Sequence, residues 1–437
     1  MKKILAAFLA LMTAATLFAG CGQTGKEANE NTDNTPNETV EPVEPAVVEI
    51  WHTYTGDQAA YLDKAAKQFN ASQSDYQVKV LAQAYSGFAD AVYNAVANHT
   101  GPSIIFNYAS TAVDYIEADL AVDITAYIEE DKKNGDDTMS KIIDSLPEAM
   151  KTDVMGFADG GIYYLPGCTT GPVFFYNKTM YDELDLVPPA TWEELAENCR
   201  VIYEAKGIPG YVADGLTDDI QALLMQNGIG YIDVANKTVE FGGTETEAIY
   251  RWFVDNCNAG YFELKPTQDY ASNDFVAAVV AGFSGSCVND QYITEAPFEI
   301  GIAPCIASGK EDFYTAWNRG PIFLAQNERT DRGAYEFIKF FLSPEMNGGW
   351  AQVNSALSPY GTTAEDAAYQ AYLADVPESL AAVEANLDKA GSFPNIHGCA
   401  QLRNLLTEYL EYAVSGAKTV SEAVAELVDA CNEALAD

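Results

Sequence analysis

Histidines, closely spaced cysteine pairs and cationic side chains are all scarce in this sequence. Only 3 of its 437 residues are histidine, namely His52, His99 and His397, which argues against a histidine-rich metal site. The 8 cysteines include no CxxC spacing, so neither a zinc cluster nor a regular disulfide framework is indicated. Buried, reduced thiols are expected instead. The sequence therefore predicts neither a bound metal nor a cofactor.

The shortage of positive charge limits which partners the chain can have. Lysine and arginine number 24 against 64 aspartates and glutamates, a formal net charge of −40. Such a field repels nucleic acid and anionic membrane surfaces, so no nucleic-acid partner is expected. It also disfavours strongly anionic ligands, unless a local cationic pocket overrides it.

Enzyme signatures are missing too. The nucleophile elbow GxSxG and the metal-binding HExxH motif are both absent. Paired carboxylates are uninformative among 64 acidic residues. A secreted carbohydrate-active enzyme or an esterase is therefore the weaker alternative, and we expect a protein that is not an enzyme.

The start of the sequence has the pattern of an export signal. Two lysines precede an apolar stretch, 4–18, and small residues lead into Cys21. Residues 1–20 are therefore predicted to be a signal peptide, too short to span a membrane. The stretch LFAGC ending at Cys21 resembles the lipobox of bacterial lipoproteins, although Phe18 stands where leucine is usual. The resemblance implies a diacylated Cys21; an accidental cysteine after a simple signal peptide is the alternative.

A polar segment follows the expected signal peptide. Residues 21–45 are rich in Asn, Glu, Thr and Pro and contain few apolar side chains. Such a segment cannot bury enough surface to offset its ordering entropy, so it is predicted to be a flexible tether. With a lipid on Cys21 it would hold the protein at the outer face of the cytoplasmic membrane. About 390 residues remain, which fits two domains.

Strand and helix patterns alternate after the tether. Strands are expected at 47–51, 77–81 and 103–106, and helices at 57–70 and 87–98. This alternation predicts an α/β fold with a parallel sheet and right-handed crossovers. The ligand crevice of such a sheet lies beyond the carboxyl ends of its strands. Residues 51–55 and 107–110 are therefore predicted to lie at the binding edge.

A second alternating unit begins near residue 163. A strand is expected at 172–176. Residues 191–194 form a capping box, in which Thr and Glu side chains satisfy reciprocal backbone donors, so a helix is expected to follow. Another capping box at 419–422 precedes a strongly amphipathic helix. No internal repeat and no second apolar run long enough to span a membrane is present.

Five blocks of this sequence, in order, carry a resemblance to a known family. They are IWHTYTG at 50–56, GPSIIF at 101–106, FFYNK at 174–178 with PPATWEEL at 188–195, AYEFIKFFLSP at 334–344, and PNI at 394–396 with the final helix. They resemble the extracellular solute-binding proteins of ABC importers, in the group of maltose-binding and glycerol-3-phosphate-binding proteins. Each block is weak alone, but their shared order is specific.

The resemblance implies a two-lobed periplasmic-binding-protein-like fold with a ligand cleft between the lobes. Lobe 1 would comprise 46–162 and 288–325, and lobe 2 would comprise 163–287 and 326–437. A small ligand would be captured by hinge closure, a population shift toward a closed state. The loaded protein, expected to be a monomer, would then dock on the transmembrane subunits of an ABC permease.

The predicted strand ends and the resemblance together indicate candidate ligand-binding residues. Sugars are bound by aromatic faces and by polar groups around their hydroxyls, which also give selectivity. Candidates after the strands of the first lobe are Trp51, His52, Tyr54, Tyr85, Asn107, Tyr108 and Ser110. Candidates in the second lobe and near the hinge are Asp218, Asp219, Ser284, Ser286, Trp317, Arg319, His397 and Arg403.

Several of these candidates also have a purely structural interpretation. The alternatives are core packing for Trp51 and Trp317, solvation for Asp218 and Asp219, and a turn for Ser284 and Ser286. Two further tryptophans, Trp192 and Trp350, are expected to pack in the core.

A neutral sugar or oligosaccharide is the predicted ligand class. Aromatic residues make up 12% of the chain and include 26 tyrosines, a composition that suits a sugar cleft. At 107–111 the aromatic residue and the Asp-Arg pair of the maltose-binding pattern are absent. Around 393–397 the arginine that glycerol-phosphate relatives use for the phosphate is also absent. A neutral sugar therefore leads, and glycerol-3-phosphate or a glycerophosphodiester is the alternative ligand.

Overall fold

The computed structural model describes residues 44–84, 86–264, 270–308, 310–311 and 313–436, apart from the side chain of Ala149. The expected signal peptide, Cys21, nearly all of the expected tether and Tyr85 lie outside the described residues.

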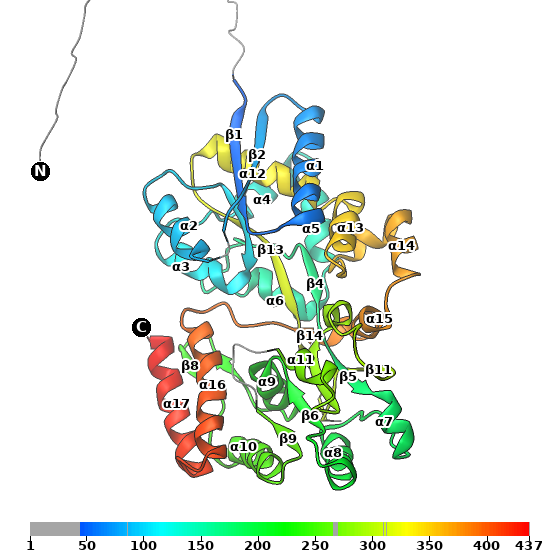
Figure 1. Cartoon of the computed structure of the whole chain (residues 1–437). Coiled ribbons are helices and arrows are strands. Elements are labelled where there is room, and N and C mark those ends of the chain that lie inside the picture. Colours follow the sequence, from blue (N-terminus) through cyan, green and yellow to red (C-terminus); the bar gives the residue numbers. More distant parts are fainter. Residues whose placement is uncertain (1–43, 85, 265–269, 309, 312, 437) are drawn as a thin grey trace, which may run out of the picture. The chain divides into compact units, whose positions relative to one another are not determined.

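Two five-stranded sheets organise the described body, and each forms the centre of one lobe (Figure 1). The first sheet has the order β2 (Tyr76–Ala82), β1 (Ala46–His52), β3 (Ile104–Tyr108), β13 (Trp317–Phe323) and β4 (Cys168–Thr170). The helices of this lobe are α1 (Gly56–Ser72), α2 (Phe88–Ala97), α3 (Ala112–Glu117), α4 (Thr125–Lys133), α5 (Thr138–Asp144), α6 (Glu148–Met155), α12 (Glu328–Phe341) and α13 (Pro344–Val353).

The second lobe occupies the lower half of Figure 1. Its sheet has the order β11 (Ile300–Pro304), β5 (Pro172–Asn177), β10 (Gly282–Ser286), β6 (Tyr211–Ala213) and β9 (Phe262–Glu263). Its helices are α7 (Lys178–Glu183), α8 (Trp192–Lys206), α9 (Leu216–Gln226), α10 (Gly243–Asn258), α11 (Ala271–Val276), α16 (Cys399–Val414) and α17 (Val420–Ala436).

Shorter elements complete the body. Two small strand pairs lie outside the main sheets. β7 (Ile232–Asp233) pairs antiparallel with β8 (Thr238–Val239), and β12 (Tyr314–Thr315) pairs parallel with β14 (Ala390–Gly391). The remaining helices are α14 (Ala367–Leu373), α15 (Glu378–Glu384) and the 3-10 turns η1 (Ala109–Thr111), η2 (Cys287–Gln291), η3 (Gly361–Glu365) and η4 (Leu387–Lys389).

The first sheet is parallel only in part. β2, β1 and β3 run parallel, as the strand-helix alternation predicts. β13 joins antiparallel to β3, and β4 joins antiparallel to β13. The expected parallel sheet is confirmed for β2, β1 and β3, but it does not extend to β13 and β4, which come from later in the chain. The local alternation at the start of the chain cannot reveal such late partners.

Several local predictions are confirmed. β3 contains Ile104, Ile105 and Phe106, all at most 1% exposed, as expected of a strand covered on both faces. The capping box of α8 is formed by Thr191 and Glu194. Residues 419–422 form the same reciprocal hydrogen bonds before α17.

The expected bounds of the two lobes remain a prediction, and two segments pack differently from it. β11 lies within 288–325, yet it pairs with β5 in the second sheet. α12 and α13 lie within 326–437, yet Phe337 and Trp350 share a buried core with Ile50 of β1. An apolar helix face must be buried, but its spacing does not specify which sheet it meets.

The chain passes from one sheet to the other at short connections. Gly171 alone separates β4 of the first sheet from β5 of the second. The segment between β11 and β13 passes back to the first sheet. These crossings bring β4 and β13 of the first sheet close to the chain of the second lobe.

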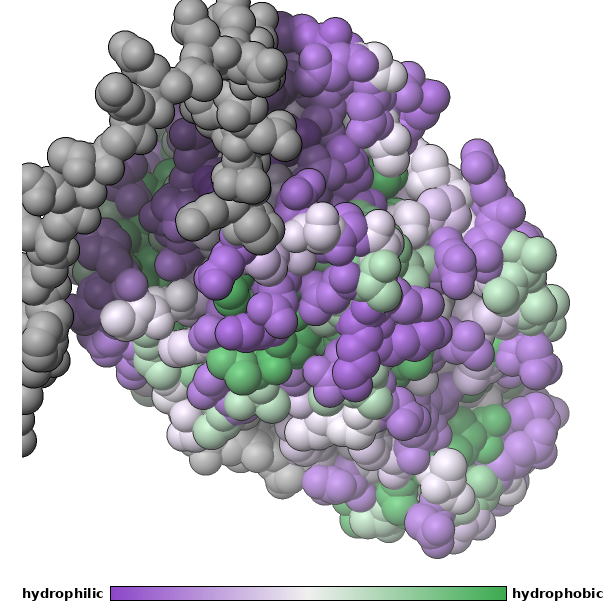
Figure 2. Space-filling model, turned by 90° about the horizontal axis from the view of Figure 1, so that it is seen from above, coloured by the Kyte–Doolittle hydropathy of each residue, from purple (hydrophilic) through white to green (hydrophobic). Residues whose placement is uncertain are grey.

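Seven cysteines fall within the described residues, and all are free thiols, five of them buried. Hydrophilic residues dominate the face seen in Figure 2, and hydrophobic residues appear there in small groups between them. Among the described residues, no helix combines the length and the apolar character needed to cross a membrane.

Candidate functional site

A cavity of about 350 Å³ lies at the carboxyl edge of the first sheet, and we call it the strand-edge cavity. Its position follows from the topology. β1 and β3 end at this edge, and the start of the antiparallel strand β13 faces the end of β3 through the pairing of Arg319 with Tyr108. The lining residues are Thr53, Tyr54, Thr55, Gln58, Tyr108, Cys168, Thr170, Val288, Trp317, Arg319, Asn354 and Ala356.

Arg319 and Tyr54 form the charged and aromatic part of this lining. The guanidinium carbon of Arg319 lies 4.5 Å from the centre of the Tyr54 ring, a cation–π contact. Nη2 of Arg319 donates to Thr53 Oγ1 over 2.8 Å. The Tyr54 ring packs edge-on against Phe106 and Trp350, so it is 6% exposed. The arginine therefore rests on a rigid aromatic support.

Local backbone geometry fixes both residues. His52 Nδ1 accepts from the backbone N–H of Tyr54 over 3.1 Å, and burial lowers the pKa of His52, which favours the neutral acceptor. Gly320 follows Arg319, and a Cβ there would lie 2.0 Å from the carbonyl oxygen of Leu165. Only glycine allows this close approach of the 165–167 chain to β13.

Two aromatic side chains offer partly exposed surface to the cavity. Tyr108, at the end of β3, is 38% exposed, and Trp317, at the start of β13, is partly buried. Neutral hydrogen-bonding groups surround them. Gln58 Nε2 donates to Asn354 Oδ1 over 2.9 Å at the same cavity.

A cluster in the second lobe contains two further predicted residues. Arg403 Nη2 of α16 donates to Asp218 Oδ1 of α9 over 2.7 Å, and the Arg403 guanidinium stacks 3.6 Å from the Phe393 ring centre. Burial raises the pKa of Asp218, and Arg403 and a hydrogen bond from Trp317 oppose that shift. Trp317, which lines the strand-edge cavity, therefore lies near this cluster.

Asp219 and Ser284 form a separate buried group. Tyr211 donates its hydroxyl to Asp219 Oδ2, and Ser284 Oγ donates to the same oxygen over 2.9 Å. Burial raises the pKa of Asp219 to about 7, although both hydrogen bonds lower it. The structure thus contradicts solvation for Asp218 and Asp219, because both are 7% exposed.

Another buried carboxyl lies beside Tyr108 and Ser110. Asp153, Asn318 and these two residues line a cavity of about 10 Å³, which is roughly the space of one water. Asn318 Nδ2 donates to Asp153 Oδ2 over 2.7 Å. Burial raises the pKa of Asp153 to about 7.

His397 lies at the rim between the lobes. Its Nδ1 is 2.9 Å from Asp114 Oδ1 and 4.0 Å from Glu117 Oε2, both on α3 of the first lobe. Lys237 of the second lobe also approaches Glu117, at 3.8 Å. The structure therefore places His397 in a contact between the lobes.

Ten of the fourteen predicted residues that the structure describes lie outside the lining of the strand-edge cavity, among them Trp51, Asn107 and Ser286. Trp51 is partly buried, and its Nε1 donates to Glu49 over 2.6 Å. Asn107 uses its Oδ1 to accept from the backbone of Tyr108. Ser286 ends β10, next to Cys287. Ligand contact by the predicted residues stays a prediction, but four of them, Tyr54, Tyr108, Trp317 and Arg319, lie around one cavity.

Sequence reasoning missed most of the neutral polar lining. Thr53 and Thr55 fall inside the expected binding edge, so the end of the first strand was a usable signal. Gln58 and Asn354 lie in or after helices, where no local pattern marks them. Among the described residues, no cluster of His, Cys, Asp and Glu is placed to hold a metal ion.

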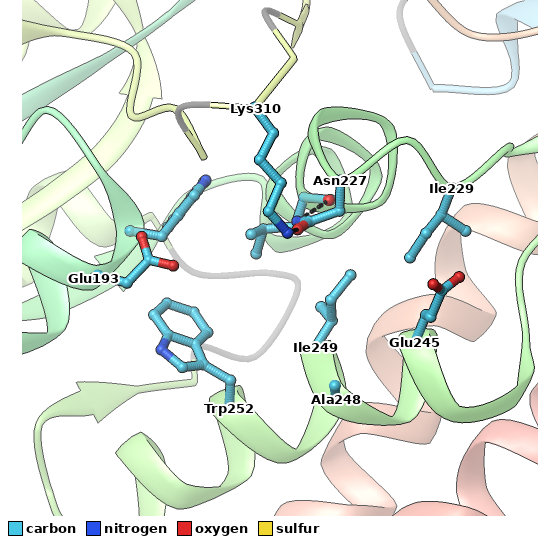
Figure 3. Close-up of a pocket in the computed structure, with 10 residues that line it drawn as sticks. Glu193, Asn227, Ile229, Glu245, Ala248, Ile249, Trp252 and Lys310 are labelled. Carbon is cyan, nitrogen blue, oxygen red and sulfur yellow. Dashed lines mark hydrogen bonds between the residues drawn. The ribbon is translucent and has the colours of Figure 1, made fainter.

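A second cavity, of about 300 Å³, lies in the second lobe beside α8, α9 and α10 (Figure 3). Trp252, Ile249 and Glu245 come from α10, and Lys310 Nζ donates to Asn227 Oδ1 over 2.6 Å. None of the predicted ligand-binding residues lines it. Its lining belongs to one lobe, so lobe closure would not act on it.

The sequence is similar to a known protein family and to several known proteins. Residues 53–348 match the family described as bacterial extracellular solute-binding protein. An sn-glycerol-3-phosphate-binding periplasmic protein, UgpB of Yersinia enterocolitica, is 24% identical over 405 residues, which cover 87% of this chain and 90% of the relative. The corresponding UgpB of Yersinia pseudotuberculosis is 25% identical over 410 residues, with the same shares covered.

Solved structures show the same fold. The cyclic alpha-maltosyl-1,6-maltose binding protein from Arthrobacter globiformis has a TM-score of 0.76 at 23% identity, covering 90% of this chain and 99% of that one. UgpB from Mycobacterium tuberculosis, in complex with glycerophosphocholine, has a TM-score of 0.71 at 18% identity, with the same shares covered. The predicted two-lobed α/β fold of periplasmic binding proteins is confirmed. Because the family match spans more than half of the sequence, the chain belongs to the bacterial extracellular solute-binding proteins.

Proposed function

We propose that the chain is the substrate-binding lipoprotein of an ABC importer and that it captures a sugar or an oligosaccharide. The observation that carries this proposal is the composition of the strand-edge cavity. Tyr108 and Trp317 offer aromatic surface, and threonine, glutamine and asparagine side chains surround them. Aromatic faces stack on the apolar C–H patches of a sugar, while hydroxyls and amides hydrogen-bond its hydroxyl groups.

Capture would proceed by hinge closure. The second-lobe cluster of Asp218 and Arg403 lies near Trp317, which lines the cavity, so closure would bring these polar groups toward a bound ligand. A ligand that contacts both lobes shifts the population toward the closed state. The closed protein would then deliver the ligand to the permease subunits.

Glycerol-3-phosphate or a glycerophosphodiester is the second candidate ligand. The names of the UgpB relatives favour it. So does Arg319, because a guanidinium suits a phosphate group. The sugar remains the first candidate because aromatic and neutral polar side chains make up most of the lining.

A thermal-shift screen of the full chain tests the proposal. The panel contains neutral oligosaccharides, sugar phosphates, glycerol phosphates and glycerophosphocholine. A ligand at 100 times its dissociation constant adds about 2.7 kcal/mol to the free energy of unfolding, which gives a clear shift. Stabilisation by a sugar supports the first candidate, and stabilisation by glycerol phosphates alone supports the second. No stabilisation across the panel contradicts both.

Anchoring and the absence of catalysis are separate parts of the proposal. Labelled palmitate fed to the producing bacteria should become attached to the wild-type chain and not to Cys21→Ser. An unlabelled wild type contradicts the anchor. Incubation of the protein with each stabilising ligand should leave that ligand intact by mass spectrometry, and turnover to a product contradicts a pure binding role.

A further inference from the structure

We propose that the strand-edge cavity contains an oxyanion subsite formed by Arg319, so that the captured ligand carries a carboxylate or a phosphate group. This inference rests on the proposed function, because it names a chemical group of the ligand taken by the same cavity. It changes the expected ligand from a neutral sugar to an anionic one.

The charge of the cavity lining suits an anionic group. Among the described residues that line the cavity, Arg319 carries the only formal charge. This is unexpected in a chain with 64 acidic residues and a formal net charge of −40. The overall field repels anions, but a nearby cation in a partly dehydrated cavity acts at short range and is screened less.

The charge of Arg319 is not neutralised by any of the described residues. Its hydrogen bonds go to neutral oxygens, Thr53 Oγ1 at 2.8 Å and the carbonyl of Phe106 at 3.4 Å. In the part of the chain that the structure describes, no carboxylate oxygen lies within 4.0 Å of its side-chain nitrogens. Its Nε is buried and has no hydrogen-bond partner there. Arg319 is partly buried, and a partly buried cation without a counter-ion is less favourable than a paired one, so proteins commonly pair it.

Arg403 shows how this chain treats an arginine with a structural role. Its guanidinium also rests on an aromatic ring, that of Phe393. In contrast to Arg319, it is neutralised by Asp218 at 2.7 Å. The two arginines share an aromatic support and differ in the counter-ion. The missing partner of Arg319 is therefore a specific feature of the cavity.

A second hydrogen-bond donor lies beside Arg319. Tyr54 lines the same cavity, and its buried hydroxyl has no hydrogen-bond partner among the described residues. Burial raises the pKa of Tyr54, so the hydroxyl keeps its proton and remains a donor. A planar guanidinium with several N–H donors matches the geometry of carboxylate and phosphate oxygens. The aromatic and amide groups of the remaining cavity suit the sugar part of the ligand.

Binding of matched pairs tests the subsite. Titration calorimetry on the full chain compares galacturonate oligosaccharides with galactose oligosaccharides, glucose 6-phosphate with glucose, and glycerol 3-phosphate with glycerol. In at least one pair the anionic member should bind more tightly, by roughly 10- to 100-fold. A preference for the uronate identifies a carboxylate ligand, and a preference for the phosphate compounds identifies a phosphate ligand.

The variants Arg319→Met and Arg319→Lys connect this preference to the residue. Arg319→Met should weaken binding of the anionic member much more than binding of the neutral member, so that the preference for the anionic member is lost. Arg319→Lys keeps the charge without the fork of donors, so it should retain part of the preference. If the neutral members bind more tightly than the anionic members, and Arg319→Met does not change this order, the oxyanion subsite is overturned. The proposed sugar function then remains intact.

Stability without ligand gives a second readout. An unneutralised cation destabilises the folded state, so Arg319→Met should keep or raise the midpoint of thermal unfolding. A fall of several degrees identifies a structural arginine and overturns the subsite. If no compound binds, the proposed function fails, and this measurement still decides whether Arg319 is held at a cost to stability.

Discussion

Arg403 donates to Asp218 over 2.7 Å and at the same time lies 3.6 Å above the Phe393 ring. The pair joins the first turn of α9 to α16 in the second lobe. The side chains of Asp218 and Arg403 are only 9% and 19% exposed. Removing one partner leaves the other charge buried without compensation, which costs more than the intact pair contributes.

Asp218→Ala should therefore lower the free energy of unfolding by about 3 to 5 kcal/mol. Denaturant unfolding at neutral pH measures this loss in free energy of unfolding. Replacing both residues, in Asp218→Leu with Arg403→Leu, should cost less than Asp218→Ala alone, because no charge is left unpaired. Glu197→Gln is the control, since its ion pair with Arg200 is exposed to solvent. Equal losses of unfolding free energy in Asp218→Ala and Glu197→Gln would contradict the prediction, because they would show that removing Asp218 leaves no costly unpaired charge.

The raised pKa of Asp219 predicts a pH dependence of stability. Burial moves it from 3.8 to about 7. Between these values the unfolded chain has released the proton and the folded chain retains it, so stability falls as pH rises from about 4 to about 7. Asp219→Asn should remove this contribution, and its unfolding midpoint relative to wild type should be higher at pH 7 than at pH 4. Asp429→Asn, an exposed position, is the control; the same pH trend in both variants contradicts the assignment.

Much of the fold could be predicted because its signals are local. The apolar run in β3 and the capping box at Thr191 lie within a few residues, and both predicted the correct element. The partner of an element is not local. β13 pairs with β3 although more than 200 residues separate them, and the apolar face of α12 gives no sign that it packs beside β1. The antiparallel strands β13 and β4 were missed for this reason.

The same distinction applies to the candidate site. Tyr54 and Tyr108 could be placed because each follows a predicted strand. The burial of Asp218 could not be predicted, because its partner Arg403 is 185 positions away in the sequence. In so acidic a chain a solvated aspartate is the simpler expectation. Asn354 enters the cavity from the end of α13, a place that depends on how that helix packs.

Tyr108→Ala tests the aromatic part of the cavity. Loss of one stacking face should weaken binding of the best ligand from the panel between roughly twofold and tenfold. Titration calorimetry measures the dissociation constant. Tyr203→Ala is a matched control, because Tyr203 of α8 is also 38% exposed and does not line the cavity. Unchanged affinity in Tyr108→Ala, or an equal loss in both variants, would contradict stacking by Tyr108.

Ion pairs across the rim predict a salt-dependent contribution to closure. Asp114 and Glu117 of the first lobe approach His397 and Lys237 of the second. Opening of the lobes would break these pairs, so they favour the closed state. All four side chains are at least 40% exposed, and such pairs are weak and screened by salt.

Asp114→Asn combined with Glu117→Gln should therefore weaken ligand binding by less than about fivefold at low ionic strength. In about 1 M NaCl the difference from wild type should vanish, because the screening length falls to roughly 3 Å. Glu129→Gln combined with Asp137→Asn is the control. It removes the same charge from pairs within the first lobe, with Lys132 and Lys141, so it should not affect closure. An equal loss in the control would assign the effect to net charge, and a loss that persists in high salt would show that the rim contributes through packing instead of charge.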